Sequence, residues 1–306
     1  MDFTNLLNLQ IMMFIMMGIG AILRKLNIIK SEDKTVITEL VINLLLPCSI
    51  VMAFYIEFSS EILQQGFLIL IISCVLHLFC LFLSKILFNK YDKDQKVILQ
   101  YGTICSNAGF LGNPIAEGVY GSLGLLYASI YLLPLRIIIW SAGLSYYTET
   151  TDKKMLVKKV ATHPCIVTVF LGMLLMITQV QLPTAISNTL SSLGSCSTPF
   201  TMLLIGVILA EGDMKTMITK TTVKFSILRL ILIPMAVFVA CKLAGVPELI
   251  AGVSILLAAM PAGTTTAILA VKYNRDAEFA TKCVVLTTIL SMVMIPIWCM
   301  IIGMWY

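Results

Sequence analysis

Two short polar stretches, each inside a long apolar segment, carry the residues of this chain best placed for chemistry. The first covers residues 106–118 and the second covers residues 259–266. Both combine glycine and proline, which interrupt a helix, with side chains that bond to ligands, namely amides in the first and hydroxyls in the second. The candidate substrate-binding residues in them are Ser106, Asn107, Asn113, Pro114, Pro261, Thr264, Thr265 and Thr266.

A helix that breaks inside a membrane leaves backbone groups without partners, so the break must line a cavity or lie buried in protein. We expect the two outgoing half-helices to begin near Ile115 and Thr265. Their N-terminal ends carry partial positive charge and free N–H groups, which suit the carboxylate of an anion. The facing C-terminal ends would suit a cation equally well. A purely structural alternative is a pair of kinked helices whose free groups are satisfied by neighbouring polar side chains.

Few ionisable residues fall within the apolar segments. Arg136 lies deep in one of them and needs a partner or a watery cavity. It could neutralise a substrate anion, pair with Glu117 or offset the negative helix ends. Glu117 and His77 are candidates for proton or ion coupling, although a single histidine in an apolar helix is more often packed. Arg229 and Lys242 are expected to reach the membrane surface from the ends of their segments.

The composition places these residues in a membrane protein. Of the 306 residues, 59% are hydrophobic and only 12% are charged, whereas soluble domains carry about 25% charged residues. The mean hydropathy is +0.97. Apolar runs of about 20 residues predict transmembrane helices, and their lack of alternation excludes a transmembrane barrel. The net charge of +5 does not indicate a nucleic-acid partner, because the basic residues lie in loops.

We predict an all-α integral membrane protein with ten transmembrane helices, located as a multi-pass protein in the cell membrane. The first apolar run lacks the basic flank of a cleaved signal, so it is expected to stay as a span. The predicted spans are 6–27, 35–56, 62–88, 95–120, 123–147, 164–180, 186–211, 222–243, 247–272 and 279–304.

The loop charges predict the orientation of these spans. Nearly all Lys and Arg residues fall in alternate loops, around residues 24–34, 85–96, 153–159, 215–224 and 272–282. Basic loops stay on the cytoplasmic side, which puts both chain ends outside (N-out/C-out).

Halving the chain at the basic connector leaves five spans on each side, and an odd number gives the halves opposite orientation. Pro47 and Pro199 are offset by 152 residues, and Pro114 and Pro261 by 147. We therefore predict two inverted five-helix repeats with crossed broken helices, in the fourth and ninth spans. The predicted units are repeat 1–148, a cytoplasmic connector 149–163 and a second repeat 164–306. Asn43, in the second span, is expected to line the pathway.

No pattern of catalytic residues is evident, so we do not expect an enzyme. The sequence has no nucleophile elbow, zinc-protease motif or nucleotide-binding loop, and its two histidines do not predict a metal site. Nine scattered cysteines show no ligand spacing and are interpreted as small buried hydrophobes. No cofactor is predicted beyond proton or sodium coupling.

The two polar stretches resemble the crossovers of the auxin efflux carrier family, which contains the plant PIN-FORMED carriers and many bacterial permeases. The resemblance rests on Gly112-Asn113-Pro114, on Val119-Tyr120-Gly121 and on the second string, residues 259–263. The span order matches over the whole chain. The long cytosolic loop of the plant carriers is missing, so the chain resembles a prokaryotic member.

The resemblance implies a scaffold of spans 1, 2, 6 and 7 and a transport domain of spans 3–5 and 8–10 that cross at Pro114 and near Pro261. It also implies elevator-type alternating access, a homodimer and an organic-anion substrate, either auxin-like or malate-like. Asn107 would be the polar residue of the first crossover. The threonine run departs from the family, which places Asn or Pro there.

Two transport hypotheses follow. The first is a secondary carrier of a small organic anion, bound at the crossover within the lipid bilayer. The alternative is a sodium- or proton-coupled antiporter or symporter of the same crossed-helix fold, which would favour carboxylates at the crossing. A receptor or an intramembrane enzyme is disfavoured, because there is neither a soluble domain nor a catalytic arrangement.

Overall fold

The computed structural model describes residues 3–30, 32–147, 157–158, 160–210 and 217–306. In these residues the chain is helical, and the extended backbone forms one isolated β-bridge, between Ser106 and Ala262. The α-helices are α1 (Phe3–Lys25), α2 (Asp33–Leu40), α3 (Leu46–Ala53), α4 (Ser60–Leu87), α5 (Lys93–Ile104), α6 (Asn113–Ile138), α8 (Pro164–Thr178), α9 (Thr184–Ser195), α10 (Ser197–Leu209), α12 (Lys220–Ile227), α13 (Ile233–Leu243), α14 (Glu248–Ala258), α15 (Thr265–Lys272) and α16 (Ala277–Trp305).

Several spans contain a turn of π-helix, the wider form that often marks functional sites in helices. These turns are η1 (Val41–Leu45), η2 (Ala108–Gly112), η3 (Ile139–Gly143) and η5 (Leu228–Leu232), and a short 3₁₀ turn, η4 (Leu144–Tyr146), follows η3. In η1, η2 and η5 the π-turn runs into an α-helix whose first or second residue is a proline: Pro47, Pro114 and Pro234. Because proline lacks an N–H, a widened turn accommodates it without a wasted hydrogen bond.

The helices are long and apolar enough for a membrane. Among the described residues, six helical segments meet both criteria: 33–53, 60–87, 108–143, 184–209, 220–243 and 277–305. The predicted class, a helical multi-pass membrane protein, is therefore confirmed. The count of ten spans, the inverted repeat and the N-out/C-out orientation stay predictions.

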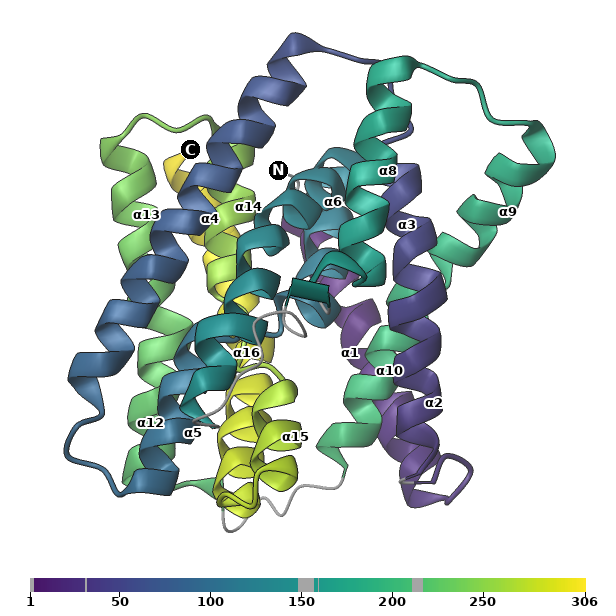
Figure 1. Ribbon diagram of the computed structural model, residues 1–306. Coiled ribbons are helices and arrows are strands. Elements are labelled where there is room, and N and C mark those ends of the chain that lie inside the picture. The colour runs from purple at the N-terminus through teal and green to yellow at the C-terminus, as the bar shows by residue number, and fades with distance from the viewer. Residues whose placement is uncertain (1–2, 31, 148–156, 159, 211–216) are drawn as a thin grey trace.

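The loops sort by charge between the two ends of the molecule. Figure 1 shows the loops after α1, α4 and α15 at its lower end, together with the basic residues of segments 24–30, 85–96 and 272–275. The loops after α3, α8 and α13 lie at the upper end with both termini. Arg275 joins two of the basic loops, because its Nη1 lies 2.9 Å from the Asp94 carboxylate.

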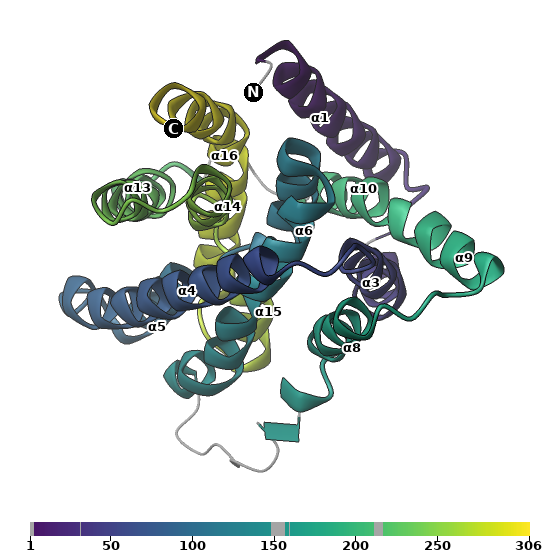
Figure 2. The same cartoon turned by 90° about the horizontal axis from the view of Figure 1, so that it is seen from above.

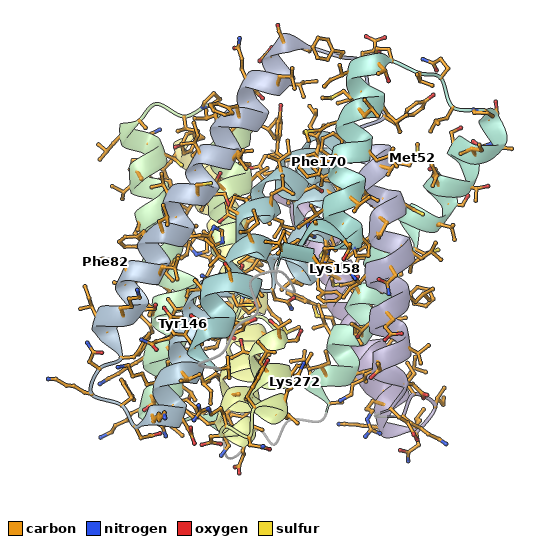
Figure 3. All side chains as sticks on the ribbon, viewed as in Figure 1. Met52, Phe82, Tyr146, Lys158, Phe170 and Lys272 are labelled. Carbon is orange, nitrogen blue, oxygen red and sulfur yellow. The ribbon has the colours of Figure 1, made fainter. Side chains whose placement is uncertain are left out.

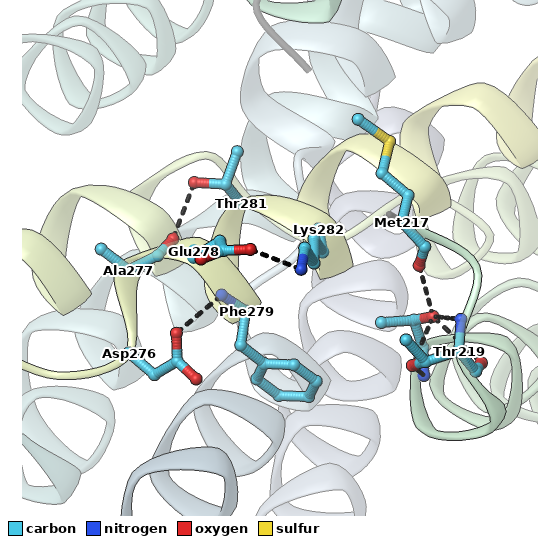
Figure 4. A network of polar contacts seen from close by, with 9 residues as sticks. Met217, Thr219, Asp276, Ala277, Glu278, Phe279, Thr281 and Lys282 are labelled. Carbon is cyan, nitrogen blue, oxygen red and sulfur yellow. Dashed lines mark hydrogen bonds and ion pairs between the residues drawn. The ribbon is translucent and has the colours of Figure 1, made fainter. Parts of the chain in front are cut away.

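Side-chain caps fix the helix starts at the basic end. Asp276 precedes α16 and accepts a hydrogen bond from the Phe279 N–H at 2.9 Å, while Lys282 pairs with Glu278 at 2.6 Å (Figure 4). Thr219 precedes α12 and exchanges hydrogen bonds with Thr222 in a capping box. These caps satisfy N–H groups that a helix start otherwise leaves free.

Seen from above, the helices form two groups with α6 between them (Figure 2). In one group α1 packs on α10, and α3 packs on α8 and α9. In the other group α4 packs on α5 and α6, and α14 packs on α6, α13 and α16. The groups meet where α6 contacts α3 and α8, and where α1 contacts α16. The roles of scaffold and transport domain for these groups remain a prediction, as do the domain boundaries.

The segment labelled α6 folds back on itself at Gly121. Gly121 has φ of 65° and ψ of −156°, a backbone conformation that favours glycine. A Cβ added at Gly124 would overlap the backbone carbonyl of Ala116. In a straight helix these two residues would lie about 12 Å apart, so the chain reverses between them. Residues 113–120 therefore continue the first broken segment, and residues 122–138 form a separate helix.

Candidate functional site

The two broken segments meet at their interruptions. α5 ends at Ile104 and the next helical turn, η2, begins at Ala108, while α14 ends at Ala258 and α15 begins at Thr265. The two connecting segments are hydrogen-bonded to each other through their backbones. The Asn107 N–H donates to Pro261 O, and the Gly263 N–H donates to Cys105 O, both at 2.8 Å. The Ala262 N–H donates to Thr287 Oγ1 of α16 at 3.2 Å. These bonds lock the crossing and satisfy most of its backbone.

The position of the first break differs from the prediction. We expected the crossing at Pro114 and the outgoing half-helix to begin near Ile115, but the bonds to the second break come from Cys105 and Asn107. The outgoing helix starts at Ala108, so Asn113 and Pro114 lie one π-turn inside it. The widened turn explains the error, since it places a proline within a helix without ending it. The second half-helix starts at Thr265, as predicted.

The amides of the first break are buried and unbonded. The Nδ2 atom of Asn107 and both polar side-chain atoms of Asn113 have no hydrogen-bond partner among the described residues. Asn107 is 3% exposed and Asn113 is 1% exposed. Buried polar groups are nearly always hydrogen-bonded, so each exception needs an explanation, such as a ligand or an ordered water. Ser106 is buried beside them and forms the β-bridge to Ala262.

One side of the first break opens onto free space. Gly109 and Phe110, in η2, are half-buried. A Cβ added at Gly109 would find no atom within 4 Å, whereas one added at Gly112 would lie 2.5 Å from Leu257 Cδ2. On the other side of this segment, Leu111 and Ile115 line a mostly apolar crevice with a volume of only about 10 Å³, roughly the space of one water. Of the two sides described here, the side at Gly109 has the more free space.

The polar groups of the second break are largely used within the protein. Thr265 Oγ1 lies 2.9 Å from Cys105 Sγ and accepts a hydrogen bond from Tyr101 at 3.3 Å. The Thr266 carbonyl accepts a hydrogen bond from Tyr147 at 3.2 Å, whereas its own hydroxyl is buried and unbonded. Thr264 is half-buried at the start of α15. Pro261 is buried, and its carbonyl serves the crossing.

Three other predicted site residues lie away from these bonds. Asn43 is exposed on η1, a turn that contacts α8, α9 and α10. Glu117 is half-buried in the outgoing half-helix, without an ion pair to any described residue. His77 is packed in α4: its Nδ1 lies 2.6 Å from the Ser73 carbonyl oxygen, and its ring meets that of Tyr131 edge-on. The packed interpretation of His77 therefore matches its surroundings best.

Arg136 is buried next to the start of α8, which belongs to the group of α1, α3, α8, α9 and α10. It is 8% exposed, and its Nη1 has no hydrogen-bond partner among the described residues. The pairing with Glu117 that the sequence allowed is not present. Its electrostatic neighbours are His163 and Cys165, at the start of α8.

Arg229 contradicts the expectation that it reaches the membrane surface. It lies in η5, is only 3% exposed, and its Nε has no partner among the described residues. It acts electrostatically on Cys80, on Tyr131 and on Cys105 of the crossing.

The comparisons with known proteins agree with a transporter. A family model described as membrane transport protein matches residues 7–299. An uncharacterized transporter of Methanothermobacter thermautotrophicus is 26% identical over 288 residues, which cover 93% of this chain and 94% of that protein. An uncharacterized transporter of Methanocaldococcus jannaschii is also 26% identical, over 95% of this chain and 97% of its own length.

The family match covers the crossing together with nearly all of the remaining chain. The chain therefore belongs to the membrane transport protein family, the group of the auxin efflux carriers.

Proposed function

We propose that this protein is a secondary transporter of a small organic anion, which binds at the crossing of the two broken segments. The observation that carries the proposal is the buried, unbonded amides of Asn107 and Asn113 beside the open space at Gly109. A carboxylate that accepts hydrogen bonds from the Nδ2 groups of Asn107 and Asn113 would satisfy both donors, whereas the acceptor Asn113 Oδ1 needs a donor such as a water. The amide groups would then stabilise the bound state by charge-assisted hydrogen bonds.

The charges around the crossing favour an anion over a cation. The helix that starts at Ala108 directs its first N–H groups and the positive end of its dipole toward Asn107. Arg229 adds a full positive charge behind Cys105. The described residues that form the crossing include no carboxylate, and Glu117 lies ten residues beyond Asn107. A site for sodium or protons would need acidic or carbonyl ligands directed at the ion.

The arrangement in two groups supports alternating access. The crossing belongs to the group that contains α4–α6 and α12–α16, and it faces the other group through α10, which contacts η2. We propose that the group of α4–α6 and α12–α16 moves as a transport domain. The group of α1, α3, α8, α9 and α10 would be the scaffold against which it moves, in an elevator-type motion. Homodimer formation through the scaffold is part of the same proposal, which rests on the family resemblance. Malate-like and auxin-like acids are the substrate classes to test.

The alternative, a cation-coupled carrier of the same fold, is kept because Glu117 is half-buried in the outgoing half-helix. A membrane potential contributes about 2.3 kcal/mol per charge for each 100 mV, which is enough to drive a single anion without a coupling ion. The two mechanisms therefore differ in which gradient is required.

Uptake by proteoliposomes tests the proposal. Vesicles with the purified full-length protein should take up labelled malate or indole-3-acetate, and a potassium-diffusion potential should change the rate. Asn107→Ala should reduce uptake by about 10- to 100-fold, whereas Asn188→Ala, which changes an exposed amide on α9, should leave it unchanged. Sodium or proton flux in the absence of any carboxylate would instead support the alternative. Binding without uptake would contradict both.

A further inference from the structure

A second cluster of unbonded polar atoms lies at the junction of α6 and α8. Arg136 belongs to the helix after Gly121, and its guanidinium is buried with Nη1 unbonded. His163 precedes α8, and its Nδ1 is also buried and unbonded. Among the described residues, neither of these two nitrogen atoms has a hydrogen-bond partner. They lie within electrostatic range of each other, and Arg136 also acts on Cys165 in the first turn of α8.

The start of α8 adds positive potential at the same place. No side chain caps this end of the 15-residue helix, and Pro164 occupies its first position. The N-terminal end of a helix carries about half a positive charge. The first turn is held against the other helices, because Cys165 Sγ lies 3.8 Å from the Ile42 carbonyl oxygen in η1. Figure 3 shows Lys158 beside this lower end of α8.

Among the described residues, the electrostatic balance of this junction is one-sided. The His163 ring lies within electrostatic range of Arg136, and its buried Nδ1 has no hydrogen-bond partner among the described residues. No acidic residue pairs with Arg136 in the described part of the chain. A buried charge without a counter-charge is costly, and such charges are normally paired.

The junction lies at about the depth of the crossing. Asn107 precedes Gly121 by 14 residues and Arg136 follows it by 15, so each lies about 20 Å from the turn along a helix. The two clusters differ in their partners, since the crossing is formed by α5, α14 and α15, whereas Arg136 faces α8 in the other group.

We propose that Arg136, His163 and the N-terminal end of α8 form a second oxyanion site, which takes a carboxylate or a phosphate group between the two helix groups. Arg136 supplies the charge and N–H donors, the first turn of α8 supplies dipole potential, and His163 supplies one hydrogen bond. The site does not depend on the transport proposal, since it is built from different residues. A lipid headgroup phosphate and a free carboxylate share the chemistry that it recognises.

Thermal unfolding of the full-length protein in detergent tests this site, with sodium propionate or inorganic phosphate as probes and sodium chloride of equal ionic strength as the reference. In the Asn107→Ala variant, which disables the crossing, the probes should still raise the unfolding temperature, by part of the wild-type amount. Adding Arg136→Gln to that variant should remove the remaining rise in unfolding temperature. The reason is that the affinity for the probes falls at least about tenfold when a charged hydrogen-bond partner is lost. Lys158→Gln, an exposed basic residue nearby, should leave the shift unchanged.

Folding of the variants has its own readout. Since Arg136 has no acidic partner among the described residues, Arg136→Gln should unfold no lower than the parent protein when no probe is present, and Arg136→Lys should keep a weaker response. If Arg136→Gln keeps the full wild-type shift, the second site is wrong, whatever happens at the crossing. If Asn107→Ala keeps the full shift and Arg136→Gln loses all of it, the second site stands and the crossing proposal fails.

A last comparison separates the two sources of the oxyanion. The Asn107→Ala protein is measured in micelles with added phosphatidylglycerol or with added phosphatidylcholine. Loss of the propionate response only with the anionic lipid assigns the site to lipid phosphate. An unchanged response in both assigns it to a free carboxylate.

Discussion

The two breaks form one crossing, yet their polar groups are used differently. At the first break, Asn107 and Asn113 have buried amides without partners and Gly109 faces open space. At the second break, Thr265 is bonded to Tyr101 and Cys105, and a Cβ at Gly263 would lie 2.7 Å from Cys105 Sγ. The backbones are alike, but the first break has free space at Gly109, whereas the second is packed at Gly263 and keeps one unbonded hydroxyl, that of Thr266.

This difference indicates a division of labour within the crossing. Unbonded buried groups reduce stability and persist where a ligand completes them, whereas bonded hydroxyls contribute to stability. We therefore expect changes at the first break to affect uptake more than stability, and changes at the second break to do the reverse. The predictions below separate the two effects.

The largest effect is expected for the two amides. Asn107→Ala and Asn113→Ala should each reduce organic-anion uptake by about 10- to 100-fold, because a hydrogen bond to a charged group contributes about 1.5–3 kcal/mol. Thermal unfolding of the ligand-free variants should stay within about 0.5 kcal/mol of the parent, since neither side chain has a partner to lose. A fall in stability with normal uptake would reverse the assignment of the first break.

A matched pair of glycine substitutions gives the next effect. Gly263→Ala should destabilise the protein by about 1–3 kcal/mol, because the new methyl group meets Cys105 in a packed crossing. Gly109→Ala should be close to neutral for unfolding, since nothing lies within 4 Å of its added Cβ. Unfolding in denaturant measures both. Equal losses for the two variants would mean that the breaks are packed alike.

The smallest effect is expected at the bonded threonine. Thr265→Val keeps the shape but removes the oxygen that bonds to Tyr101 and Cys105. Stability should fall by about 0.5–1.5 kcal/mol, and uptake should stay within about twofold of the parent. Tyr101→Phe should cause part of the same loss. A large loss of uptake in stable Thr265→Val protein would place a ligand contact at the second break as well.

The sequence predicts the breaks well because their cause is local. Glycine, proline and asparagine interrupt an apolar run wherever they fall, and the second half-helix begins at Thr265, as expected. The predicted spans 95–120 and 123–147 leave residues 121–122 between them, and the structure turns at Gly121. The position of the first break was wrong by several residues, because a π-turn carries Asn113 and Pro114 inside the helix.

The partners of the buried arginines could not be predicted from the sequence. Whether Arg229 reaches the surface depends on how its helix is rotated against Cys80 and Tyr131, which is a long-range property. In the same way, Arg136 faces α8 and not Glu117, because the hairpin at Gly121 sets its direction. The Thr265 hydroxyl looks free for a ligand in the sequence, yet it is bonded by Tyr101, which lies 164 residues away.

Labelling of a cysteine placed at Gly109 tests the central claim most directly, that an organic anion reaches the first break through the open space beside it. The account predicts that Gly109→Cys reacts with a membrane-impermeant thiol reagent above the background of the native cysteines, and that malate or indole-3-acetate slows the reaction. Gly263→Cys, buried in the packed break, should react no faster than the parent. Equal labelling at both positions, or labelling at Gly109→Cys that no organic anion protects, would contradict it.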